Sequence, residues 1–200
     1  MTEWIIELIQ RGGYFGVAML MLLENVFPPI PSELVLPFAG YVAATGELHP
    51  AGVWAAAIAG SLAGALPWYW AGRLLGVNGL REFARRHGRW LTLEPHHVDA
   101  ANAWFRRHGP ASVGFGRLVP TVRSVISLPA GVAKMRIHAF LFWSTLGTAA
   151  WSALLLGAGY MLQSRYESVQ DAVEWIARGV LVLLVGAYLW RVARFGKRKA

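Results

Sequence analysis

The chain has 200 residues, of which 56% are hydrophobic and only 15% are charged, whereas soluble domains carry about 25% charged residues. This composition excludes an ordinary soluble domain and indicates an all-α integral membrane protein with a single membrane domain over residues 1–200. The formal net charge is +8, and the absence of cysteine excludes disulfides, thiolate metal sites and a cysteine nucleophile.

The first predicted elements are a short amphipathic helix and a broken apolar hairpin. Residues 2–11 predict a helix at the membrane interface, because their apolar side chains share one face. Apolar arms follow at 14–23 and 34–45, each too short to cross a hydrocarbon core that needs about 20 residues. The proline-rich stretch from Glu24 to Glu33 breaks the helix between them. Two short arms around a polar tip predict a re-entrant hairpin.

A spanning helix and a basic segment come next. Residues 51–72 carry no charge and are long enough to cross a membrane, and Gly60 and Gly64 give this helix a small-xxx-small face for close packing. Residues 73–109 are rich in arginine and punctuated by glycine, which predicts amphipathic helices on the cytoplasmic surface. The basic run is read as a topology signal, with specific lipid or protein recognition as the alternative.

The second half of the chain resembles the first. Residues 110–135 predict a second hairpin of short apolar arms, and residues 137–163 and 175–193 predict two further spanning helices, about three in all. Placing the first hairpin on the second matches four residues, Pro28, Ser32, Leu36 and Pro37, with Pro120, Ser124, Leu128 and Pro129. Residues 14–72 and 110–163 therefore predict an inverted repeat of opposed hairpins, an arrangement typical of transporters.

The distribution of lysine and arginine predicts the orientation. The basic tail after residue 193 is expected in the cytoplasm, and the loop 164–174, in which acids outnumber bases, outside. The two hairpins then open to opposite faces of the membrane. Basic residues beside apolar segments favour anionic lipid headgroups, not nucleic acid, as partners.

The charged residues of the two hairpins are the candidate functional residues. A charge at the bilayer centre costs about 2.5–3.5 kcal/mol even on insertion scales, so Glu24, Glu33, Arg117 and Arg123 need partners. A guanidinium group keeps its proton and suits a carboxylate or a phosphate. Either the arginines only pair with the carboxylates and hold the hairpin tips together, or they also receive an anionic headgroup.

Two serines and the two carboxylates have further predicted roles. Ser32 and Ser124 are expected to begin the returning arms, where free N–H groups can bind phosphate, with ordinary helix capping as the alternative. Glu24 ends an inbound helix, where the helix dipole disfavours negative charge, whereas Glu33 begins one. This difference suits a proton relay, with a static pair to arginine as the alternative.

Other polar and aromatic residues are expected to be structural. Asn25, Tyr69, Trp70 and Trp151 belong here, because the ten tryptophans mostly indicate anchoring at the interface. The scattered histidines predict no metal site, and no nucleophile or acidic metal motif lies at membrane depth. We therefore expect neither a cofactor nor an enzymatic activity.

Three segments carry a resemblance to a known family. "ENVFPPIPSE", "GRLVPTVRSVISLPAGVAKM" and "GTAAW" resemble the DedA family of the VTT-domain superfamily over residues 14–163. The resemblance implies a multi-pass protein of the bacterial inner membrane with two opposed re-entrant hairpins. Some bacterial members return undecaprenyl phosphate across the membrane, others are linked to membrane potential, drug and alkaline tolerance or phospholipid handling, and eukaryotic relatives scramble phospholipids.

The family motifs match this sequence at Glu24, Glu33, Arg117 and Arg123. In some members the second acidic residue is an aspartate after glycine, whereas here Glu33 follows Ser32, which leaves the subgroup and the substrate open.

The leading expectation for function is a flippase for a polyprenyl phosphate such as undecaprenyl phosphate, in a bacterial plasma membrane with the C-terminus in the cytoplasm. Arg117, Arg123 and the two serines would hold the phosphate, and the carboxylates would couple its movement to protons. The alternatives are a proton-coupled exporter of small cations and a general phospholipid scramblase. Self-association into a homo-oligomer is compatible with the sequence.

Overall fold

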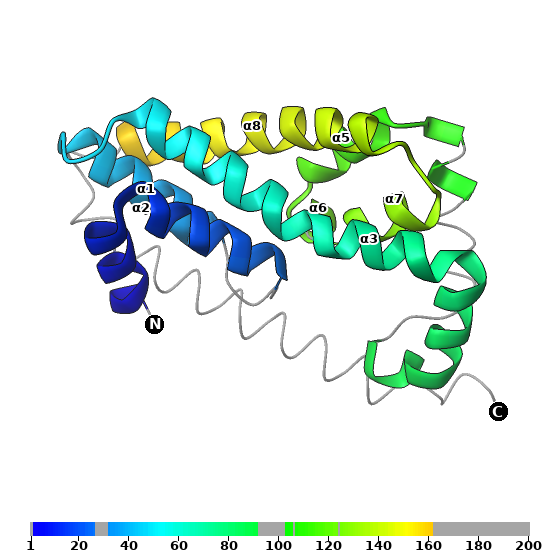
Figure 1. Cartoon of the computed structure of the whole chain (residues 1–200). Coiled ribbons are helices and arrows are strands. Elements are labelled where there is room, and N and C mark those ends of the chain that lie inside the picture. Colours follow the sequence, from blue (N-terminus) through cyan, green and yellow to red (C-terminus); the bar gives the residue numbers. More distant parts are fainter. Residues whose placement is uncertain (1, 27–31, 92–102, 106, 124, 162–200) are drawn as a thin grey trace.

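The computed structural model describes residues 2–26, 32–91, 103–105, 107–123 and 125–161 (Figure 1). All regular structure in these segments is helical, as expected. The predicted spanning helix 175–193 and the basic tail lie outside the described residues. The same is true of the loop 164–174, so the predicted orientation stays a prediction.

The first hairpin region consists of two helices. Helix α1 runs from Thr2 to Val26 and is kinked at Gly13, where φ is 52° and ψ is −132°. A positive φ suits glycine, so the predicted break between residues 2–11 and 14–23 is confirmed. Helix α2, Ser32–Ala44, has 13 residues and is about 20 Å long at 1.5 Å per residue, too short to span a membrane.

Two long helices form the centre of the molecule. Helix α3 runs from Pro50 to Leu91 and bends at Gly76, where φ is 61°. Helix α8 runs from Ile137 to Met161. Within the described part of the chain, Pro50–Glu82 and α8 are the helices long and apolar enough to cross a membrane. The helices predicted at 51–72 and 137–163 are therefore present.

The second hairpin region is more broken than expected. It contains α5 (Ala111–Arg117), α6 (Pro120–Arg123) and α7 (Ser127–Val132) in place of two simple arms. The N-cap of α7 is Ile126. Ser124, the predicted cap of the returning arm, lies outside the described residues.

The short helices pack against the two long ones in a crosswise pattern. Helices α1 and α7 pack along α3, whereas α2 and α5 pack along α8. In Figure 1, α1 and α2 lie toward one end of the long helices, and α5, α6 and α7 toward the other. Each group has its own apolar core cluster, one around Leu20 and Leu36 and one around Tyr69 and Phe140.

Glycine permits the close approach of these helices. A Cβ atom on Gly60 or Gly72 of α3 would collide with the backbone of α1 or α7, respectively. On the other long helix, a Cβ on Gly159 would collide with the backbone of α2. The expected role of Gly60 in close helix packing is thus confirmed.

Candidate functional site

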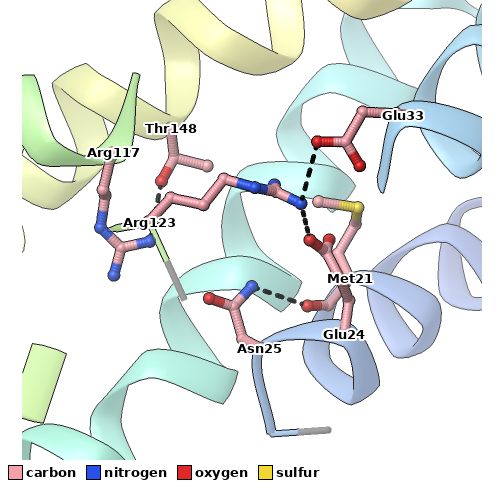
Figure 2. A network of polar contacts seen from close by, with 7 residues as sticks. All are labelled: Met21, Glu24, Asn25, Glu33, Arg117, Arg123 and Thr148. Atoms are coloured by element: carbon pink, nitrogen blue, oxygen red, sulfur yellow. Dashed lines mark hydrogen bonds and ion pairs between the residues drawn. The ribbon is translucent and has the colours of Figure 1, made fainter. Parts of the chain in front are cut away.

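Arg123 joins the two halves of the chain. It lies in the last turn of α6 and forms an ion pair and a hydrogen bond with Glu24, near the end of α1 (Figure 2). Its Nη2 atom is also 3.8 Å from Oε1 of Glu33, in the first turn of α2. One guanidinium therefore contacts carboxylates from both arms of the first hairpin region.

The two carboxylates have different environments. The side chain of Glu24 is 3% exposed and that of Glu33 is 42% exposed, although both face Arg123. A buried carboxylate depends on its ion pair much more than an exposed one does. The geometry therefore makes Glu24 the main partner of Arg123, and Glu33 a secondary one that solvent or lipid headgroups can reach.

Arg117 has a different kind of environment. It ends α5, is 3% exposed, and donates hydrogen bonds to Thr148 Oγ1 and Ser127 Oγ, each at 3.2 Å (Figure 2 shows the first). None of the ion pairs among the described residues includes Arg117. The interpretation that both arginines pair with the carboxylates thus holds for Arg123 and is wrong for Arg117.

A small cavity lies next to the two arginines. Its volume is about 10 Å³, roughly the room that one water molecule needs. Its lining contains both polar and apolar side chains, from Met21, Asn25, Leu36, Ser61, Arg117, Arg123, Thr148, Trp151 and Ser152. The site as it stands is closed to anything of the size of a phosphate.

Trp151 is a site residue that sequence analysis treated as structural. Arg123 Cζ lies 5.8 Å from the centroid of the Trp151 ring, a distance at which a cation and an aromatic face attract each other. Trp151 also lines the cavity together with Thr148 and Ser152, which are four residues apart and share a face of α8. In the sequence, this pair of hydroxyl residues beside Trp151 was the signal that could have indicated a polar face at this point of the apolar helix.

The other predicted residues lie as follows. Ser32 is the first residue of α2, and Ser124 lies outside the described residues. Asn25 has a structural position, as expected, because its side chain bonds to the Met21 carbonyl and its own carbonyl accepts a bond from Trp68. Within the described segments, no three histidine, aspartate or glutamate side chains lie close enough to share a metal ion.

Comparison with known proteins covers most of the chain. Residues 30–161 match the family model described as VTT domain. An "Alkaline phosphatase-like protein" of Lactococcus lactis subsp. lactis (strain IL1403) is 40% identical over 200 residues, 100% of this chain and 94% of the relative.

Two further relatives share a printed name, "Undecaprenyl phosphate transporter A". The protein of Staphylococcus aureus (strain NCTC 8325 / PS 47) is 34% identical over 200 residues, 100% of this chain and 98% of its own. That of Bacillus subtilis (strain 168) is 31% identical over 181 residues, 90% of this chain and 87% of its own. No solved structure matches the chain significantly.

Proposed function

The chain belongs to the VTT domain family, the DedA family, and we propose that it is a flippase that moves a polyprenyl phosphate, such as undecaprenyl phosphate, across a bacterial plasma membrane. The names of the Staphylococcus and Bacillus relatives support this class of substrate. The family and these names point to a transporter and not to an enzyme, although another relative is called alkaline phosphatase-like. The two long apolar helices support the membrane location.

The observation that carries the proposal is the environment of Arg117. A buried guanidinium with hydroxyl partners, and with no ion pair in the part of the chain that the structure describes, is unfavourable at membrane depth, where a charge costs about 2.5–3.5 kcal/mol. A lipid phosphate would supply the anion, and its oxygens fit the paired N–H groups of arginine. The polyprenyl tail would remain in the bilayer while the headgroup occupies the site.

Entry of a phosphate requires the ion pairs of Arg123 to open. The cavity of about 10 Å³ has no room for a headgroup unless the side chains around it separate. The incoming phosphate would replace Glu24 as the anion on Arg123. Because Glu24 is buried, its carboxylate would then favour taking up a proton. Substrate binding and proton uptake would thus be coupled through one exchange at Arg123.

The packing of the helices supports opposed re-entrant hairpins in an inverted repeat. The first arm of each hairpin region packs on the long helix that follows it in the chain, α1 on α3 and α5 on α8. The second arms pack crosswise, α2 on α8 and α7 on α3. A two-fold relation between the halves would produce this exchange, and it would allow the site to open alternately to either face.

Transbilayer movement in proteoliposomes tests the proposal. Fluorescent polyprenyl phosphate, a fluorescent phospholipid and a small cationic dye are followed in parallel, with and without an imposed pH gradient. We expect the wild type to move the polyprenyl phosphate but neither the phospholipid nor the dye, and we expect Arg117→Met to move none of the three. Equal movement of both lipids would indicate a scramblase. Proton-driven export of the dye that survives Arg117→Met would contradict the proposal and indicate an exporter.

A further inference from the structure

Three buried N–H groups beside the cavity have no acceptor among the described residues. They are Nε of Arg117, Nε of Arg123 and Nε1 of Trp151, and all three residues line the cavity. They come from α5, α6 and α8, so the fold, not a local motif, gathers them. Buried N–H groups are almost always paired, so three in one place point to a ligand rich in acceptors.

Trp151 contributes to the cavity in two separate ways, through the face of its ring and through its N–H group. The face of its ring attracts the Arg123 guanidinium, which leaves the N–H at the ring edge as an independent donor. Its neighbours Thr148 and Ser152 line the same cavity, and Thr148 also holds Arg117. The indole is therefore in contact with Arg123 and shares the cavity with Thr148, which holds Arg117.

We propose that Trp151 donates its Nε1 hydrogen to the substrate phosphate and makes the site selective for a phosphate monoester over a phosphodiester. This inference rests on the proposed function. A monoester presents three terminal oxygens, one for each of the two arginines and one for the indole. A diester has only two, and its additional ester oxygen is a poorer acceptor that carries a second carbon group. A phosphodiester headgroup would therefore make one of the three donors share a charged oxygen with another or use the weaker ester oxygen.

The variant Trp151→Phe tests this role, because it keeps an aromatic face for Arg123 and removes the N–H. A matched control is Trp54→Phe, which removes an indole N–H that donates to the Ala149 carbonyl at 3.0 Å, outside the cavity. The full chain is placed in nanodiscs and titrated with farnesyl phosphate and with phosphatidylglycerol. We expect Trp151→Phe to weaken binding of farnesyl phosphate about tenfold and that of phosphatidylglycerol less than twofold, and Trp54→Phe to change neither.

The indole N–H signals in a ¹⁵N–¹H spectrum give a readout that a purely structural role would not move. One of the ten signals, the one missing in Trp151→Phe, should shift when farnesyl phosphate is added to the wild type and stay in place with farnesol. If Trp151→Phe does not fold, the wild-type spectrum still decides, because ten unmoved signals overturn the inference.

The two proposals fail in distinguishable ways. A wild-type protein that does not prefer farnesyl phosphate to farnesol contradicts the proposed function itself. A wild type that binds farnesyl phosphate selectively, with Trp151→Phe binding equally well and no indole signal shifted, overturns the role of Trp151 and leaves the proposed function intact.

Discussion

Replacing Arg117 with methionine should separate substrate binding from stability. The guanidinium is buried and, among the described residues, donates hydrogen bonds only to the hydroxyls of Thr148 and Ser127, each at 3.2 Å. Those bonds stabilise the fold by about 1.5–3 kcal/mol each, whereas desolvation of the buried charge costs several kcal/mol. Methionine replaces the aliphatic part of the arginine side chain and carries no charge. We expect the free energy of unfolding to change by no more than about 2 kcal/mol, because the two effects oppose each other.

The same substitution should have a large effect on binding. Loss of one partner of a buried, hydrogen-bonded charge pair costs about 2–5 kcal/mol, which corresponds to a Kd for polyprenyl phosphate about 30-fold to about 5,000-fold higher. Unfolding in detergent, followed by near-ultraviolet circular dichroism, and binding of farnesyl phosphate are measured on the same preparations. The expected result is a folded protein that no longer binds the phosphate lipid.

Arg123→Met provides the contrast. It leaves Glu24, 3% exposed, without the arginine that faces it, and removal of one partner from a buried pair costs about 3–5 kcal/mol of stability. The double variant Arg123→Met/Glu24→Gln should recover most of that stability and still fail to bind. A loss of stability in Arg117→Met as large as that in Arg123→Met, with a folded fraction that binds like the wild type, would contradict a role of Arg117 in binding. Arg117 would then serve only to hold α5 to its neighbours.

Three further variants and one control probe the ion pairs and the packing. Glu24→Gln removes the carboxylate that competes with the phosphate for Arg123, so the phosphate lipid should bind about tenfold more tightly. Transport in proteoliposomes should also become insensitive to a pH gradient. A retained pH response would contradict the role of Glu24 in proton coupling. Glu33→Gln should change the Kd of the phosphate lipid less than threefold, because the Glu33 carboxylate is 3.8 Å from the Arg123 guanidinium and 42% exposed. A larger effect than that of Glu24→Gln would make Glu33, not Glu24, the main partner of Arg123. Gly159→Ala forces a Cβ against the backbone of α2 and should destabilise the fold by about 1–3 kcal/mol, whereas Gly157→Ala, with nothing within 4 Å, should not. Equal thermal midpoints for these two variants would show that α2 and α8 can separate at no cost.

The helices and their breaks could be predicted because local chemistry decides them. Gly13 lies at the break between the first two predicted elements, and Pro50–Glu82 contains the predicted apolar span. The pairing of Arg123 with Glu24 also followed from the sequence, since charges at membrane depth need partners. These features depend on residue type and spacing alone.

The partners of Arg117 could not be predicted, because they depend on how helices distant in the sequence face each other. A serine or threonine in an apolar helix can also bond to its own backbone, as Ser152 does to the Thr148 carbonyl at 2.6 Å. Nothing in the sequence therefore distinguished Thr148 and Ser127 as ligands of a guanidinium. The turn α6 was missed as well, although a proline at a first helical position, here Pro120, is a known signal.

The most direct test of the central claim compares two lipids that differ only in the phosphate. Polyprenyl phosphate and the polyprenol of the same chain length are titrated onto the wild-type protein and onto Arg117→Met in nanodiscs. We expect the wild type to bind the phosphate lipid far more tightly than the alcohol, and Arg117→Met to remove the difference. Equal binding of both lipids by the wild type, or a preference for phosphate that survives in Arg117→Met, would contradict the assignment of Arg117 as the headgroup ligand.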